Sequence, residues 1–168
     1  MAILTISRQN GSMGDEIAQT LADRMGWAIL NREKMLQLIF EPICSETEMY
    51  KLRESAKFFL EERIPDETYL DYLTDRLLEL SARESLILVG FGSQIIFSDH
   101  DEAVHLRLMA PEETRIERIK RLYNCQDADA EQIMVKGDRK HKRFVSTVHD
   151  ADLTDCSLYD ITLNTARL

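Results

Sequence analysis

The stretch from Ile3 to Trp27 reads ILTISRQNGSMGDEIAQTLADRMGW, and its three parts predict a strand, a turn and a helix. Ile3–Ile6 is short and rich in β-branched residues, as buried strands are. A turn-like segment, Gln9–Ser12, follows it. Asp15–Met25 then has apolar residues at helical spacing, and Gly26 is a natural residue to end that helix. This order of strand, loop and helix is the context in which the N-terminus of a helix can bind an anion.

Strands and helices alternate along the rest of the chain. The expected strands are Trp27–Leu30, Leu86–Val89, Val104–Met109 and Tyr159–Asn164, and the expected helices lie over 31–40, 45–63, 66–83, 93–97, 111–122 and 127–148. This alternation implies βαβ units, and hence an α/β fold in three layers with about five parallel strands. Residues 31–83 look wholly helical, which predicts a helical region inserted at one edge of the site.

Length and composition narrow the class of protein. The 168 residues fit one domain, and 44% apolar residues are enough for a core. A net charge of −9 argues against a general binder of nucleic acids or anionic membranes. No segment has the roughly 18 uninterrupted apolar residues of a membrane span. The three cysteines have no metal-ligand spacing, which favours free thiols in a reducing compartment. We therefore expect a cytoplasmic protein; its oligomeric state has no signature in the sequence.

Positive charge gathers in one segment. Residues 115–143 hold nine Lys or Arg and five Asp or Glu, whereas the remaining chain carries 12 Lys or Arg and 25 Asp or Glu. A basic segment on an acidic protein can concentrate a small polyanion at one place. A solvated helix that carries both charge signs is the alternative interpretation.

The loop after the first strand departs from the nucleotide-binding signature G-x-x-x-x-G-K-[ST]. If Gly14 stands where the lysine belongs, then Arg8, Met13 and Asp15 stand at the two glycines and the hydroxyl residue. None of these four positions matches. An ordinary turn between a strand and a helix therefore remains an alternative to a phosphate-binding loop.

Three blocks of sequence, taken in order, resemble the cytidylate kinase-like family, which is of the P-loop nucleoside monophosphate kinase type. They are the opening stretch, the segments 87–92 and 103–115, and an ending from Asp138-Arg139 through Tyr159-Asp160-Ile161-Thr162-Leu163-Asn164-Thr165. The similarity covers nearly the whole chain and is weakest over residues 40–85. It implies a single P-loop NTPase-type domain over 1–168, with a helical insertion at about 31–83. It also implies a basic lid and a following helix at about 112–149.

The resemblance also implies a site and a reaction. ATP with Mg²⁺ would donate a phosphoryl group to CMP or dCMP, so that nucleotides are the expected partners. The residues expected to hold the nucleotide are Arg8, Asn10, Gly11, Ser12, Met13, Gly14, Asp15, Glu16 and Arg118. Three arginines, Arg115, Arg139 and Arg143, are expected to act on the transferring phosphoryl group, because arginine forks suit phosphate oxygens. No residue is assigned as a metal ligand. Each arginine could instead form a surface ion pair, and Arg8 could pair with a carboxylate of a neighbouring helix.

Four residues differ from the family pattern at the expected site. Met13 replaces a glycine, Asp15 and Phe91 replace arginines, and Asn31 stands where an aspartate is common. A carboxylate at the start of a helix favours the helix dipole but repels a phosphate. Two hypotheses therefore stand side by side. The first is an ATP-dependent nucleoside monophosphate kinase, and the second is a non-catalytic nucleotide- or anion-binding domain that senses or scaffolds.

Overall fold

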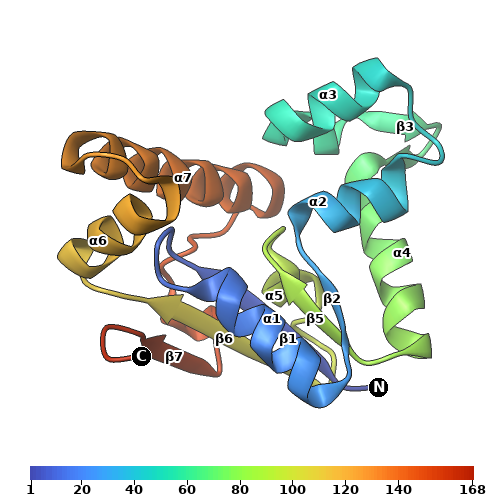
Figure 1. Ribbon diagram of the computed structural model, residues 1–168. Helices are drawn as coiled ribbons and strands as arrows, with labels where there is room; N and C mark the ends of the chain where they lie inside the picture. Colours follow the sequence, from blue (N-terminus) through green and yellow to red (C-terminus); the bar gives the residue numbers. More distant parts are fainter.

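The computed structural model describes all 168 residues and contains a five-stranded parallel sheet (Figure 1). The strands lie in the order β2-β5-β1-β6-β7. Their bounds are β1 Ile3–Arg8, β2 Ala28–Leu30, β5 Leu86–Val89, β6 Ala103–Met109 and β7 Ile161–Asn164. Strand β5 lies between β2 and β1, and all four of its residues are buried because its two faces contribute to the two cores on opposite sides of the sheet. The α/β parallel-sheet fold predicted from the sequence is confirmed.

Helices cover the sheet unequally. Helix α1, Gly14–Met25, packs its Ala18 and Ala22 on the face that includes Ile6 and Ile87. The other face lies under a larger core to which α4, Tyr69–Arg83, contributes Leu73 and Leu77. Helix α5, Ser93–Ile96, is short and follows β5. The hydrophobic core is therefore smaller on the α1 face of the sheet than on the α4 face.

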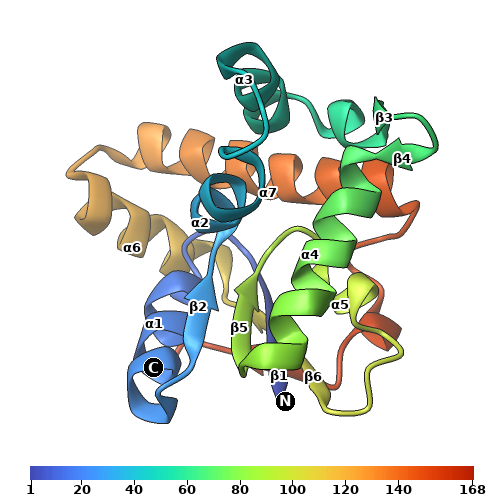
Figure 2. The same cartoon turned by 90° about the vertical axis from the view of Figure 1, so that its right-hand side faces the viewer.

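Two helices near the C-terminus form a separate unit. Helix α6, Glu112–Tyr123, and helix α7, Asp127–His149, pack together through a small cluster of Ile119, Ala130 and Met134. Figure 2 shows α7 running across the carboxyl ends of the strands. Ligands of open parallel sheets bind at that edge, so α7 covers the part of the molecule where a site is expected.

The predicted helix over 45–63 is wrong in its second half. Helix α2, Arg32–Met35, continues as a π-helix over Leu36–Phe40, and α3 spans Glu46–Glu54. A 3₁₀ helix, Ala56–Leu60, then leads into a two-stranded hairpin of β3, Glu62–Ile64, and β4, Glu67–Thr68. The turn of the hairpin contains Pro65 and Asp66, whose φ is 66°. Residues 31–83 are therefore mostly, but not wholly, helical, and Thr68 rather than Asp66 caps α4.

Glu48 connects the start of α3 to α4. It accepts hydrogen bonds from the backbone N–H and the hydroxyl of Ser45, both at 2.7 Å, in a capping box. The hydroxyl of Tyr69 donates a third bond to its other oxygen at 2.5 Å. These bonds favour the charged carboxylate and lower the pKa of Glu48 from 4.5 to about 2, the bond from Tyr69 contributing most.

Acid should therefore loosen this connection. A depressed pKa contributes stability above the unfolded value, and that contribution is lost as the pH falls from about 4.5 towards about 2. We expect the urea midpoint of the wild-type protein to fall more steeply over this window than that of Glu48→Gln. Glu46→Gln, an exposed position on the same helix, is the control. Parallel curves for wild type and Glu48→Gln would contradict the assignment.

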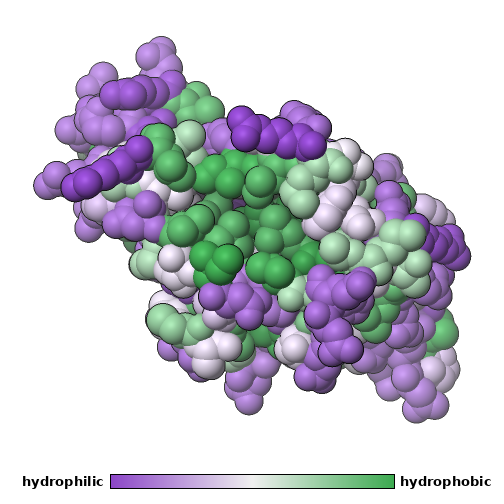
Figure 3. All heavy atoms as spheres, turned by 90° about the horizontal axis from the view of Figure 1, so that it is seen from below, coloured by the Kyte–Doolittle hydropathy of each residue, from purple (hydrophilic) through white to green (hydrophobic).

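The α1 side of the sheet leaves apolar side chains in solvent. Val104, Ile161 and Leu163 are all more than 40% exposed, at 42%, 46% and 45%. The register pairs Ile161 with Leu106 and Leu163 with Leu108, which places both on the α1 face. Figure 3 shows a continuous hydrophobic area on the lower side of the molecule, where β6 and β7 lie in Figure 1. None of the helices combines the length and the apolar character that crossing a bilayer requires.

Candidate functional site

The loop between β1 and α1 presents a row of unpaired amides. Gly11 and Met13 have φ values of 80° and 64°, which turn the backbone sharply before the helix begins at Gly14. No acceptor within the chain receives the amides of Gly11, Met13, Gly14, Asp15 and Glu16. These N–H groups lie at the positive end of the α1 dipole. Their arrangement suits an anion such as a phosphate.

The carbonyl groups of the same loop are all occupied. Arg115 donates to the Asn10 carbonyl at 3.2 Å and Arg118 to the Gly11 carbonyl at 3.4 Å. The hydroxyl of Thr165 donates to the Ser12 carbonyl at 2.8 Å. Cations and a hydroxyl therefore bind the loop from its carbonyl side, and the amides are left for a ligand.

Helix α7 also holds the loop. The Asp138 carboxylate accepts the backbone N–H of Asn10 at 2.8 Å and pairs with Arg115 at 2.6 Å. The amide side chain of Asn10 donates to the Ile133 carbonyl at 3.0 Å. A Cβ at Gly137 would lie 2.5 Å from the Asn10 side chain. The missing side chain at Gly137 is what allows α7 to approach the loop this closely.

The arginines expected to act on a phosphoryl group fall into two sets. Arg115 is buried and Arg118 half-buried, and both contact the loop backbone and its neighbours. Arg139 and Arg143 are exposed, and the structure does not bring them to the loop. The residues of α7 that face inward are Asp138, His141, Phe144 and Val145. Arg139 and Arg143 line none of the cavities next to this row and fall opposite the centre of the row at about 100° per residue.

Arg8 forms the ion pair that was one of its two expected roles, and its contact with a phosphate stays a prediction. Its guanidinium pairs with Asp15 of α1 at 3.2 Å, which is the expected pair with a neighbouring helix. Its side chain crosses directly over Gly14, where a Cβ would lie 2.4 Å from it. Arg8 also lines two adjoining cavities at the carboxyl edge of the sheet.

The larger cavity, here called the loop cavity, has a volume of about 550 Å³. The loop between β1 and α1 and the first turn of α1 form one wall, and α6 forms the other. The residues used below are Met13, Gly14 and Asp15 from the first wall and Arg118, Leu122 and Tyr123 from the second. Leu122 and Tyr123 are 68% and 57% exposed, so apolar surface is available beside the free amides.

The smaller cavity, here called the aromatic cavity, has a volume of about 200 Å³ and lies on the other side of Arg8. Phe91 and Phe144 form an apolar wall, with ring centroids 5.2 Å apart. Arg32 and Lys140 add positive charge to the lining. An anion with an apolar or planar body fits such a combination of groups.

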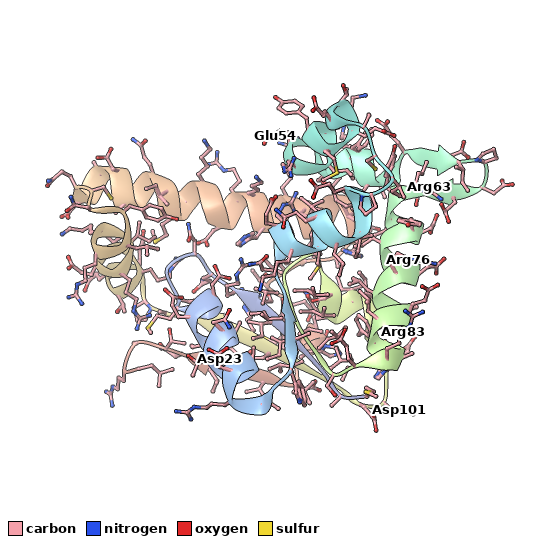
Figure 4. The ribbon with its side chains drawn as sticks, turned by 45° about the vertical axis from the view of Figure 1, so that its right-hand side comes forward. Asp23, Glu54, Arg63, Arg76, Arg83 and Asp101 are labelled. Atoms are coloured by element: carbon pink, nitrogen blue, oxygen red, sulfur yellow. The ribbon has the colours of Figure 1, made fainter.

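Arg32 lines the aromatic cavity and is a candidate site residue that the sequence analysis did not name. It makes no ion pair, and its guanidinium lies 4.8 Å from the centre of the Phe91 ring. The carbonyls of Leu52 and Arg53 orient it at 3.1 and 3.3 Å. Burial lowers the pKa of Arg32, and the negative charge of Glu54 partly offsets this by raising it. Figure 4 labels Glu54 at the end of α3. The feature of the sequence that could have indicated it is its position two residues after β2, at the carboxyl edge of the sheet.

Other arginines lie away from these cavities. Figure 4 shows Arg63, Arg76 and Arg83 along the outer side of α4 and the adjoining hairpin. Arg63 and Arg76 lie over the Tyr72 ring at 4.4 and 5.4 Å. These contacts are explained by packing of the helical region, so the positive charge relevant to a ligand is that around Arg8 and Arg32.

Curated relatives match almost the full chain at low identity. A protein named cytidylate kinase from Haloarcula marismortui is 26% identical over 98% of this chain and 81% of its own length. A second cytidylate kinase, from Methanocaldococcus jannaschii, is 23% identical over 98% of this chain and 89% of its own.

Solved structures support the fold. An uncharacterized protein from Eubacterium ventriosum aligns with a TM-score of 0.78 at 19% identity, over 97% of this chain and 88% of that one. Shikimate kinase from Bacteroides thetaiotaomicron aligns with a TM-score of 0.55 at 12% identity, over 98% and 86%. Both similarities are too distant to inform on the substrate. With the gluconokinase from Sinorhizobium meliloti, TM-score 0.55 at 11% identity over 99% and 84%, they identify an α/β P-loop kinase fold.

The decisive comparison is with a family model. The model of the Cytidylate kinase-like family matches residues 3–167, which include the loop, both cavities and the helix α7 that covers them. The chain therefore belongs to the Cytidylate kinase-like family.

Proposed function

We propose that this protein transfers the terminal phosphoryl group of MgATP to a nucleoside monophosphate, with CMP or dCMP as the acceptor that its relatives suggest. The observation that carries the proposal is the pair of cavities that meet at Arg8 and His141. One cavity contains the free amides of the loop, and the other contains an unpaired cation against aromatic rings. A phosphoryl transfer needs two such sites side by side with positive charge between them.

The loop cavity is the proposed donor site. The free amides from Gly11 to Glu16 would bind the donor phosphates, and Arg8 would supply the charge that the missing lysine supplies in the usual signature. The Tyr123 ring and the apolar surface of Leu122 would lie against the base. Arg115 and Arg118 would act through the loop, because both hold its carbonyls.

The aromatic cavity is the proposed acceptor site. Arg32 would bind the acceptor phosphate, since it is a half-buried cation without a carboxylate partner. Phe91 and Phe144 would pack against the nucleoside. Phe91 stands where an arginine was expected, and Arg32 lies over its ring, so the charge at this place comes from another element of the fold.

Magnesium would enter with the nucleotide. No group of three or more His, Cys, Asp or Glu side chains could hold a metal by itself. Mg²⁺ commonly binds through substrate phosphates and one or two carboxylates, so this set of residues fits MgATP as a substrate. Asp15 and Glu16 are the carboxylates at the helix start beside the loop cavity.

A second function, nucleotide binding without turnover, is favoured by one observation. The Asp138 carboxylate already accepts the Asn10 amide, so an anionic side chain is in contact with the loop. A bound phosphate would meet this negative charge, and Met13 and Asp15 add bulk and a further negative charge nearby. These features would lower the rate of transfer more than they would lower binding.

A kinase assay distinguishes the two functions. The purified protein is incubated with MgATP and each of CMP, dCMP, UMP, AMP and GMP, and both ADP and the diphosphate product are measured. The kinase hypothesis predicts product with CMP or dCMP. The binding hypothesis predicts stabilisation by ATP in a thermal shift experiment without product.

Arg32→Met tests the acceptor site. Loss of a charge-assisted contact costs on the order of 2 kcal/mol, so the KM for the acceptor should rise about 30-fold. The KM for ATP should remain close to the wild-type value. Arg139→Met is the matched control, because Arg139 is exposed on the far side of α7. A larger loss in Arg139→Met than in Arg32→Met would refute this assignment and support the arginines expected from the resemblance.

A further inference from the structure

One histidine lies where the cavities meet. His141 projects from the inner face of α7 and lines the loop cavity, the aromatic cavity and a third cavity of about 100 Å³. Arg8 is the other cation-bearing residue common to all three. A group bound in either main cavity would therefore lie beside His141. The imidazole makes no hydrogen bond within the chain, so its ring nitrogens remain available to a ligand.

The surroundings of His141 keep it neutral while the cavities hold no anion. Burial is the main cause, and the positive charges of Arg8 and Arg32 add to it, whereas Asp138 and Asp15 oppose it. Together they lower the pKa of His141 from 6.5 to about 4. Lys140, Lys142 and Arg107 add further positive charge to the lining of the adjoining cavities.

We propose that His141 is a phosphate-binding residue that takes up a proton when a polyanion occupies the cavities. The inference rests on the proposed function, because it needs phosphates on one or both sides of Arg8. Bound phosphates bring several negative charges to a place where cations now dominate. The imidazole then becomes an imidazolium, and both of its N–H groups donate to phosphate oxygens.

The direction of the pH dependence follows from this change. The pKa of His141 is higher in the complex than in the free protein, so protonation strengthens binding. Binding is strongest below the free value of about 4 and weakens as the pH rises towards the pKa of the complex. Between the two values, each pH unit should reduce the affinity up to about tenfold.

Calorimetry measures the proton directly. ATP and inorganic pyrophosphate are titrated into wild type and His141→Gln at pH 6 in buffers with different ionisation enthalpies. The ligands' own protonation contributes equally to both proteins, so the difference between them isolates His141. We expect wild type to take up about 0.5 to 1 proton more than His141→Gln, with the difference vanishing near pH 8.5.

A spectroscopic measurement identifies the group. The chain has four histidines, and the ring resonance that is absent from His141→Gln belongs to His141. This resonance should shift towards the imidazolium position when pyrophosphate is added at pH 6. His141→Arg, which carries a permanent charge, should bind pyrophosphate with a pH dependence no steeper than that of His141→Gln.

The outcomes separate this inference from the proposed function. Equal proton uptake by wild type and His141→Gln, with ATP bound to both, would overturn the role of His141 and leave the proposed function standing. Proton uptake with pyrophosphate, but no product from any monophosphate, would support the role and refute the kinase. If neither ATP nor pyrophosphate binds to wild type, both proposals fail.

Discussion

Replacing Arg115 by methionine is expected to lower the free energy of unfolding by about 2–3 kcal/mol, below the 3–5 kcal/mol typical of a broken buried ion pair. Arg115 is only 7% exposed and binds both the Asp138 carboxylate and the Asn10 carbonyl. Its removal leaves the Asp138 carboxylate without a cation, with only the backbone N–H of Asn10 as a partner. The Asp138 side chain is 32% exposed, so water offsets part of the loss. Urea denaturation measures this effect.

Two further variants sharpen this test. Arg121→Met changes an exposed arginine of the same helix and should leave stability within about 0.5 kcal/mol of wild type. Asp138→Asn combined with Arg115→Met removes the unpaired charge and should recover part of the loss. If Arg115→Met is as stable as Arg121→Met but has lost activity, Arg115 serves the chemistry rather than the loop.

Gly137→Ala should destabilise the protein, against the usual preference of helices for alanine. Alanine in a helix interior is normally favoured over glycine by about 1 kcal/mol. Here the new Cβ would lie 2.5 Å from the nitrogen and 3.0 Å from the Cγ of the Asn10 side chain. That side chain is bonded to Ile133, so it cannot move without losing a hydrogen bond. Overpacking of this kind costs about 1–3 kcal/mol. Over most of that range the cost exceeds the gain of about 1 kcal/mol from the higher helix propensity of alanine.

Displacement of the loop should also weaken ATP binding in Gly137→Ala. Thermal unfolding with and without ATP measures both effects. The double variant Asn10→Ala/Gly137→Ala removes the group that clashes and should be more stable than Gly137→Ala alone. Ser146→Ala, at an exposed position of α7, is the control for helix propensity and should be neutral or stabilising. A stabilised Gly137→Ala would show that α7 does not press on the loop.

The local sequence pattern predicted the strands of the sheet and the helix that follows the first strand. The apolar run Leu86–Val89 predicted a strand, and β5 spans these same four residues, all of them buried. Gly26 predicted the end of α1 and has the left-handed φ of 66° that such an end requires. Helix 45–63 was overextended, because periodicity alone did not reveal the 3₁₀ turn and hairpin after Glu54.

The sequence predicted the candidate site only in part. The residue types of the loop and the basic segment pointed to an anion, and the family was recognisable from their order. The sequence did not show which face of α7 points inward, because the spacing of Arg139 and Arg143 fits any side of a helix. Arg32 and His141 were missed for the same reason, since each is meaningful only beside Arg8, at least 24 positions away in the chain.

Sequence by itself determined where the strands of the sheet and most of the helices form, and that a turn with glycine precedes α1, since these depend on interactions between near neighbours. Tertiary structure decided which side chains surround that turn. Contacts such as Asn10 with Asp138 and Ser12 with Thr165 join residues more than a hundred positions apart. Packing of α6 and α7 against the loop selects them, and local propensity carries no information about such packing.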